Sequence, residues 1–295
     1  MSKIKRRRKK KSSSRINKME NRDDNYSIMN YNVNYVFAKG GVEDANAVKI
    51  MEAIGSISAD IVCLQETHKG YESLIVSKFG ENYPHRHFYH SGAAGGIATL
   101  SKYPIEKTLV LDNDVHIKGR FAFFFFKFNC KSHIYGASSS WFKILVCVLN
   151  VDGERVQVVN VHLRPPVEDS GKAYLWTMRT TSSIRKMEVE YMLKRLPENP
   201  SEVATFIVGD FNENDGYSAL EELKKGGFAD ALQEYCPKVH THWWILFKFY
   251  KLLSRLDHSF YNKTIKALSC EVVEGYEGNA SDHLPIVTTF VFERK

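Results

Sequence analysis

The run ADIVCLQ at residues 59–65 decides the fold class of this 295-residue chain. It is apolar from Ile61 to Leu64 and contains no Gly or Pro, which is typical of a strand that is buried on both faces. The runs ATFIVGDF at 204–211 and LPIVTTFVF at 284–292 have a similar character. Strands of this kind need covering layers, so we expect a layered protein.

Weaker patterns fill the chain around these runs. Further strands are predicted at residues 27–33, 95–105, 144–151 and 156–163, and the last two flank the hairpin turn signal Asp152-Gly153. Apolar residues at helical spacing predict helices at residues 44–57, 74–79, 180–196 and 218–225. Strands outnumber helices and hairpins are mixed with helical crossovers, which favours a layered α/β sandwich over a doubly wound parallel sheet.

Charge divides the chain into a basic tail and a mildly acidic body. Residues 1–22 hold eleven Lys or Arg and one acid, so they carry +10, and with a total of +7 the remainder carries −3. We expect residues 1–25 to be a disordered tail that contacts nucleic acid, import machinery or anionic lipid, or that is solvated without a specific partner. No linker divides residues 26–295, which we expect to form one catalytic domain.

The cysteines and the apolar runs indicate the compartment. Five cysteines, an odd number, show no CxxC pair and no zinc-site spacing, which is typical of reduced thiols. The basic tail contains no apolar signal core, and no apolar stretch reaches the roughly 18 to 20 residues that span a bilayer. We therefore expect an intracellular protein, cytoplasmic or nuclear and not secreted, without a transmembrane segment.

Polar residues gather where the predicted strands end. Each one alone is a weak signal, because Asn is common at turns and a single His is often structural. Together they are the inventory for binding a hard divalent cation through oxygen and for hydrolysing an anionic ester beside two imidazoles. These residues are Asn32, Glu66, His162, Asp210, Asn212, Asp282 and His283.

Seven blocks of sequence resemble the endonuclease/exonuclease/phosphatase superfamily and occur in the order typical of it. The superfamily includes deoxyribonucleases, abasic-site endonucleases, neutral sphingomyelinases, inositol-polyphosphate phosphatases and tyrosyl-DNA phosphodiesterases. The resemblance implies a four-layer α/β sandwich, in which helices flank two packed, mostly antiparallel mixed β-sheets, and a Mg²⁺-dependent phosphoesterase, with Mn²⁺ as an alternative cofactor. The blocks are MNYNVNY (29–35), DIVCLQET (60–67), GGIATLSKYPI (95–105), VVNVHLRPP (158–166), IVGDFNEN (207–214), RLDHSFY (255–261) and SDHLPIV (281–287).

The resemblance implies a role for each matching residue. Glu66 is expected to be the principal metal ligand, with Asn32 holding the metal or its water and Asp282 an outer ligand. Asp210 is expected to polarise the attacking water, and Asn212 to position that water and a phosphate oxygen.

Other matching residues are expected to contact the phosphate. His162 is expected to donate to the phosphoryl oxygens, and His283 to contact the scissile phosphate while Asp257 orients it. Whether Asp210 or His283 is the base stays open at this point. Arg164 follows His162 by two residues, so strand alternation would place both on the same face, where Arg164 could bind a substrate phosphate. The alternative is a surface arginine at the strand exit.

Two segments bear on the substrate. Residues 119–140 look like an insertion: a recognition or membrane-touching loop, an extra edge strand, or an intron read as coding sequence. The aromatic run at 241–253 is suited to stacking bases or a tyrosyl group, to entering a lipid interface, or to packing on the core. We expect a phosphodiester substrate, cleaved as by a nuclease or a tyrosyl-DNA phosphodiesterase. The alternatives are a lipid-directed phosphodiesterase of the neutral sphingomyelinase type and a non-catalytic binding module.

Overall fold

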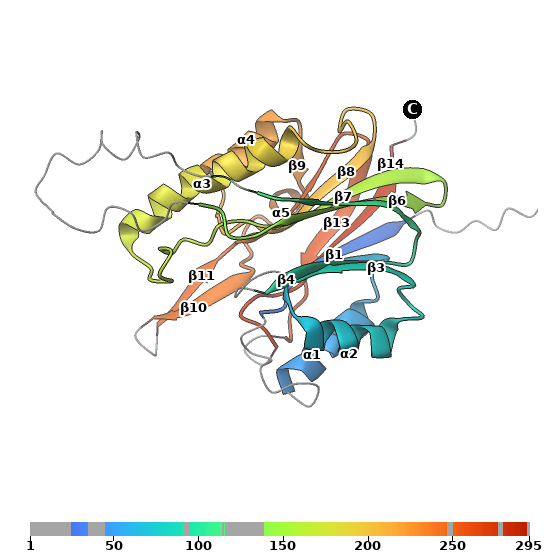
Figure 1. The fold of residues 1–295 in the computed structure, drawn as a ribbon, viewed down its shortest axis with the longest axis horizontal. Coiled ribbons are helices and arrows are strands. Elements are labelled where there is room, and N and C mark those ends of the chain that lie inside the picture. The colour runs from blue at the N-terminus through green and yellow to red at the C-terminus, as the bar shows by residue number, and fades with distance from the viewer. Residues whose placement is uncertain are drawn as a thin grey trace, which may run out of the picture.

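In the computed structural model, two six-stranded β-sheets pack face to face and helices cover their outer faces (Figure 1). The structure describes residues 25–34, 45–90, 95–113, 115, 139–246, 250–276 and 280–293. The arrangement confirms the predicted four-layer α/β sandwich. The predicted tail and the predicted insertion lie almost wholly outside the described residues.

The first sheet contains β1 (Tyr26–Asn32) and β2 (Ile61–Thr67) as its central parallel pair. Its other neighbouring strands run antiparallel to each other. The strand order is β13 (Ile265–Val272), β14 (Ile286–Phe292), β1, β2, β4 (Gly96–Ser101) and β3 (His85–Tyr89).

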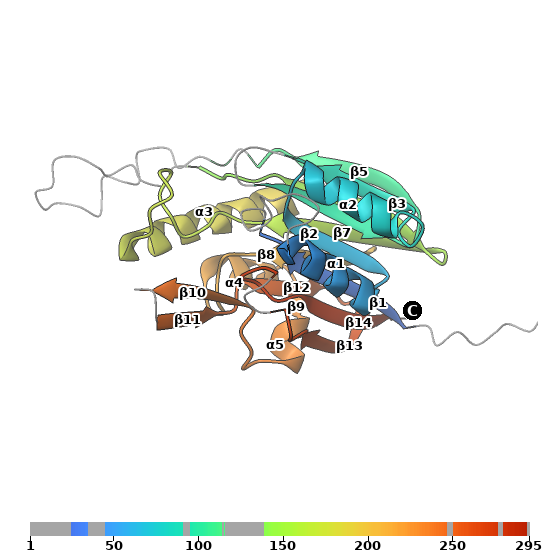
Figure 2. The same ribbon diagram turned by 90° about the horizontal axis from the view of Figure 1, so that it is seen from below.

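The second sheet has the same plan, with β7 (Glu154–His162) and β8 (Ala204–Asp210) as its parallel pair. The strand order is β5 (Ile105–Leu111), β6 (Ile144–Val151), β7, β8, β12 (Asp257–Tyr261) and β9 (Ala229–Asp230). A separate two-stranded hairpin, β10 (His242–Leu246) and β11 (Tyr250–Ser254), extends from the sandwich on the same side as α3 (Figures 1 and 2).

Five helices among the described residues accompany the sheets. Apolar residues of α1 (Ala45–Ile57) and α2 (Lys69–Phe79) pack on the first sheet, and those of α3 (Leu175–Leu193) and α4 (Ser218–Lys225) pack on the second. The short helix α5 (Ala231–Tyr235) lies against β13. A central layer between the two sheets includes Ile61, Cys63, Val158 and Phe206, each fully buried, which explains why the strand runs at 59–65 and 204–211 read as apolar on both faces.

Local signals account for where the elements begin. The turn at Asp152-Gly153 has positive φ at both residues, 50° and 98°, as a tight two-residue hairpin requires. Helix α2 begins five residues earlier than predicted, because the His68 imidazole accepts a hydrogen bond from the Gly70 amide and caps it. No helix among the described residues is both long enough and apolar enough to cross a bilayer.

The strand registers determine where the polar strand ends meet. Asn32 pairs with Gln65 in the first sheet, next to Glu66. In the second sheet, Asp210 lies opposite His162 on one side and opposite Asp257 on the other. The two sheets therefore present these ends at one common edge of the sandwich.

Candidate active site

The structure brings Asn32, Glu66, His162, Asp210 and His283 into one cluster at this edge. The Asn32 amide nitrogen donates to Glu66 Oε1 at 3.2 Å and to Asp210 Oδ2 at 2.9 Å. The Nε2 atoms of His162 and His283 each lie 3.6 Å from Asp210 Oδ2. Side chains that are up to 251 residues apart in the sequence thus surround one carboxylate oxygen.

The backbone at Glu66 is bent to aim this carboxylate. Its φ is +56°, and the register of β2 shifts between Gln65 and Thr67, as at a β-bulge. Gly95, with φ of +82°, lies so close that a Cβ atom there would sit 2.8 Å from the Glu66 Cα. The glycine that begins the 95–105 block is therefore needed by Glu66, a requirement that sequence reasoning did not assign to it.

Burial controls the charge of the two carboxylates. It raises the pKa of Glu66 to about 7, opposed by the Asn32 hydrogen bond and by His283. It raises the pKa of Asp210 to about 6, opposed chiefly by His283. The surrounding positive charge is thus too small to offset the cost of burying either carboxylate in its ionised form. The Glu66 side chain keeps 19% of its surface exposed and can be reached from solvent.

The two histidines differ in charge. Burial lowers the pKa of His162 to about 3, helped by the nearby His283, so His162 is neutral at physiological pH. Phe142 stacks on its ring at 3.8 Å between centroids with 9° between planes, which fixes the plane of the imidazole. Phe142 follows the predicted insertion and was missed by sequence reasoning.

His283 is held as a cation. Burial alone would lower its pKa, but Asp257 and Asp210 outweigh burial and raise the pKa to about 10. Its Nδ1 donates to Asp257 Oδ2 at 2.7 Å, and Asp257 is fully buried. The predicted orienting partner therefore lies in contact with His283.

Asp282 lies beside the cluster. His242, which sequence reasoning missed, joins Asp282 to the cluster. Asp282 Oδ1 accepts from the side-chain amide of Asn34 at 2.7 Å, and His242 Nε2 lies 3.8 Å from Oδ2. Burial opposes ionisation, but the contacts with His242, His283 and Asn34 lower the pKa of Asp282 below its usual range. His242 also contacts the His283 ring, at 4.5 Å between centroids.

Asn212 lies next to the cluster in a strained turn. Its φ is +52°, its backbone amide donates to Asp210 Oδ1 at 2.9 Å, and its side-chain amide donates to the Leu163 carbonyl at 3.0 Å. These two hydrogen bonds, one from the backbone and one from the side chain, hold the Asn212 side chain at the border of a neighbouring cavity.

Arg164 is not brought into the cluster. Its side chain is fully buried, and Nη2 donates to the Val167 carbonyl at 3.0 Å and to Asp169 Oδ1 at 2.7 Å. The guanidinium lies 3.6 Å from the centre of the Trp141 ring. Strand β7 ends at His162, so strand alternation no longer determines the direction of this side chain.

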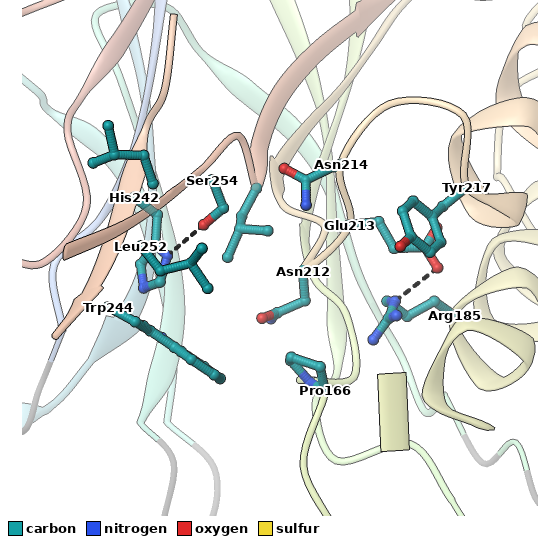
Figure 3. A pocket seen from close by; sticks show the side chains of 12 residues that line it. Pro166, Arg185, Asn212, Glu213, Asn214, Tyr217, His242, Trp244, Leu252 and Ser254 are labelled. Carbon is teal, nitrogen blue, oxygen red and sulfur yellow. Dashed lines mark hydrogen bonds and ion pairs between the residues drawn. The ribbon is translucent and has the colours of Figure 1, made fainter. Parts of the chain in front are cut away.

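A cavity of about 210 Å³ lies next to the cluster (Figure 3). His242, Trp244 and Leu252 of the β10–β11 hairpin line one side of it, and Asn212 lies between that side and the opposite wall. That wall includes Arg185 and Glu213, whose charges pair at 2.9 Å. The cavity therefore has an apolar, aromatic wall and a polar wall without strong net charge.

The oxygen and nitrogen donors at these strand ends suit a hard divalent cation. Such an ion prefers one or two carboxylates together with water and substrate oxygen, and here Glu66 supplies a partly exposed carboxylate and Asp210 a buried one. Asp210, Asp257 and His283 also offer ligand atoms within 4.8 Å of one another. The side-chain oxygen of Asn32 accepts from the backbone amide of Asn34 at 3.0 Å. The side-chain nitrogen of Asn32 therefore faces the carboxylates of Glu66 and Asp210.

Fold and site together define an α/β sandwich that carries an acidic, histidine-containing site at the ends of its central strands. The family model of the endonuclease/exonuclease/phosphatase family matches residues 29–283. The chain belongs to this family. A comparison with curated protein sequences finds no match.

Solved structures show the same fold. An endonuclease/exonuclease/phosphatase family protein from Leptotrichia buccalis aligns with a TM-score of 0.63 and 16% identity, covering 90% of this chain and 100% of that one. TDP2 from D. rerio, complexed with single-strand DNA product, gives 0.62 and 14%, covering 91% and 99%. The human Nocturnin catalytic domain with bound sulfate gives 0.63 and 15%, covering 92% and 95%.

Proposed function

We propose that this chain is a divalent-metal-dependent phosphodiesterase that hydrolyses its substrate by direct attack of water. The observation that carries the proposal is the convergence of Asn32, His162 and His283 on the Asp210 carboxylate, with Glu66 held beside it by the Asn32 amide. Buried acids, a neutral imidazole and an imidazolium at one point provide for water activation and for stabilising charge on a phosphate.

Glu66 is the proposed principal ligand of Mg²⁺, with Mn²⁺ as the alternative. Asn32 holds the Glu66 and Asp210 carboxylates in place and contacts the metal or its water, and Asp282 is an outer ligand. When bound, the cation supplies Lewis-acid stabilisation of the negative charge on the phosphoryl oxygens.

Asp210 is the proposed base. Its pKa of about 6 leaves it ionised at neutral pH and still able to accept a proton from water. His283, with a pKa of about 10, already carries its proton and is unsuited to that role. Asn212 positions the water and a phosphate oxygen.

The two imidazoles act on the phosphate. The His283 imidazolium, oriented by Asp257, contacts the scissile phosphate, and the neutral His162 donates to a phosphoryl oxygen as charge develops. Water forms a new P–O bond, its proton passes to Asp210, and the ester P–O bond breaks. The leaving oxygen then takes a proton from solvent.

The proposed substrate is a nucleic-acid phosphodiester, cleaved as by a nuclease or a tyrosyl-DNA phosphodiesterase. The aromatic wall formed by Trp244 beside Asn212 supports this, because bases stack on such surfaces. The D. rerio TDP2 structure, which holds a single-strand DNA product, adds support from a protein of the same fold. Arg164, the predicted phosphate-binding residue, is fully buried and paired with Asp169 outside the cluster, so it is not part of this proposal.

A lipid phosphodiester is the second candidate. Leu252 and Leu253 of the hairpin are 43% and 48% exposed, so the hairpin is not simply packed on the core. Exposed leucines next to a site are suited to contact with a lipid surface.

A substrate panel tests the proposal. Nicked duplex, single-stranded DNA, tyrosyl-DNA and sphingomyelin vesicles would be assayed with Mg²⁺, with Mn²⁺ and with EDTA. Turnover that EDTA abolishes supports the proposal, and no turnover with either metal on any ester rejects it. Trp244→Ala should raise KM on nucleic acid, whereas Trp176→Ala, an exposed tryptophan on α3 outside the cavity, should not.

The proposal extends to the domain organisation and the location of the protein. Residues 26–295 are the proposed catalytic domain, with residues 119–140 as an insertion. The basic tail at residues 1–25 is proposed to contact nucleic acid, import machinery or anionic lipid in an intracellular protein, cytoplasmic or nuclear.

A further inference from the structure

Three buried carboxamides form a hydrogen-bonded chain behind the candidate active site. Gln65 Nε2 donates to Asn30 Oδ1 and to Asn160 Oδ1, both at 2.7 Å. Asn30 Nδ2 in turn donates to Asp257 Oδ1 at 3.4 Å. All four side chains are at most 1% exposed. The chain leaves the second sheet at β7, crosses β2 and β1 of the first sheet, and returns to the second at β12.

Backbone carbonyls determine the orientation of the first carboxamide. Asn160 Nδ2 donates to the carbonyls of Leu64 at 3.2 Å and Ala98 at 2.8 Å. Carbonyl oxygens only accept hydrogen bonds, so the Asn160 amide cannot be flipped without placing its oxygen against two other oxygens. The Asn160 oxygen must therefore face Gln65.

The orientation then passes along the chain. Gln65 has to donate to the Asn160 oxygen, and its second N–H is directed at Asn30. Asn30 must therefore accept with its oxygen and present its own N–H to Asp257. A flipped Asn30 would oppose an N–H to the Gln65 N–H and an oxygen to the Asp257 carboxylate, which is unfavourable at both ends.

Asp257 is thus held from two sides. Oδ1 faces the Asn30 donor, while Oδ2 accepts from His283 Nδ1 at 2.7 Å. The Asp257 backbone amide is also fixed, because it donates to Thr241 Oγ1 at 3.1 Å. Rotation of the carboxylate would break the Asn30 and His283 contacts together.

We propose that Asn30 is a positioning residue that acts on His283 through Asp257, with Gln65 and Asn160 setting its orientation. This inference rests on the proposed function for its kinetic consequence. Its structural content, a link between the Asn30 amide and the His283 ring, can be measured without turnover.

Gln157 supplies a matched control. It is a buried carboxamide of β7, like Asn160, and it bonds to Thr205 Oγ1 at 3.3 Å and to the Glu198 backbone. None of these partners belongs to the cluster. A substitution there tests what the loss of a buried carboxamide does by itself.

The experiment compares Asn30→Asp, Asn30→Leu and Gln157→Leu in the full chain. Asn30→Asp keeps an acceptor for Gln65 and replaces the donor that faces Asp257, whereas Asn30→Leu removes both. The readouts are kcat and KM for bis(p-nitrophenyl) phosphate and the ¹⁵N signals of the His283 ring, assigned with His283→Gln.

We expect both Asn30 variants to lower kcat on the order of 10- to 100-fold with KM within about twofold, since misplacing one group has effects of this size. The His283 ring signals should shift in both, while Gln157→Leu leaves kcat and these signals unchanged. A folded Asn30→Asp protein with wild-type kcat and unmoved His283 signals would overturn the proposal. If the wild type hydrolyses no ester, the proposed function fails, and the His283 signals alone decide the inference.

Discussion

Replacing Asp257 with Asn should make catalysis sensitive to alkaline pH. In the wild type, Asp257 and Asp210 together raise the pKa of His283 to about 10 against the opposing effect of burial. Asp257→Asn keeps the shape and removes the first of these two charges, so the His283 pKa falls toward its ordinary value of 6.5. At pH 8 the imidazolium would then be present in about one molecule in thirty, a loss of about 30-fold in kcat.

The assay is kcat for a chromogenic phosphodiester at saturating Mg²⁺ between pH 5.5 and 9.5. The wild type should keep its rate up to about pH 9, and the variant should lose about tenfold per pH unit above its new pKa. Asp230→Asn is the matched control, because Asp230 forms an equivalent buried pair with His258 at 2.8 Å outside the cluster. An Asp257→Asn profile whose alkaline limb coincides with that of the wild type would refute the reasoning.

Four further predictions concern the acids and the tail. Glu66→Gln should abolish metal-dependent turnover and leave Tm equal or higher, because burial disfavours its charge; Glu190→Gln on α3 is the control in calorimetry and assay. Asp210→Asn should lower kcat by about 10²- to 10⁴-fold with little change in KM in steady-state kinetics. The affinity of the metal-free protein for Mg²⁺, measured by isothermal titration calorimetry, should fall as the pH drops through about 7 to 6, where Glu66 and Asp210 take up protons; an affinity that stays constant down to about pH 5 would contradict both pKa shifts. Deleting residues 1–22 should weaken salt-dependent binding to nucleic acid and leave turnover of a small diester unchanged.

The sequence predicted the elements whose patterns are strong. The helix at 218–225 and the strand at 144–151 occur with the predicted bounds. The apolar residues of the helix lie on one face toward a single core, and those of the strand are buried on both of its faces. Strand β3 was missed, since all five of its residues are half-buried at a sheet edge and show no alternation. Strand β13 was missed because a β-bulge between Ala267 and Ser269 breaks its alternation, so that the buried side resumes only at Cys270.

The site was predictable to the extent that it lies at strand ends. Asn32, Glu66 and Asp210 end apolar runs, so their clustering follows from topology once the sheets are known. The contacts of Phe142 with His162 and of His242 with His283 join distant segments and have no local signal. Arg164 shows the limit of periodicity, because alternation along a strand stops giving directions where the strand ends.

The charge balance of the body links the site to the tail. Arg164 pairs with Asp169 and Arg185 pairs with Glu213, so the arginines nearest the described cluster are already neutralised. Of the two histidines that face Asp210, only His283 is charged at neutral pH. A polyanionic substrate would therefore be attracted at the site by the bound cation and by one imidazolium, against a body at −3. Long-range attraction to such a substrate has to come from the +10 tail, which is why binding and turnover should separate when the tail is removed.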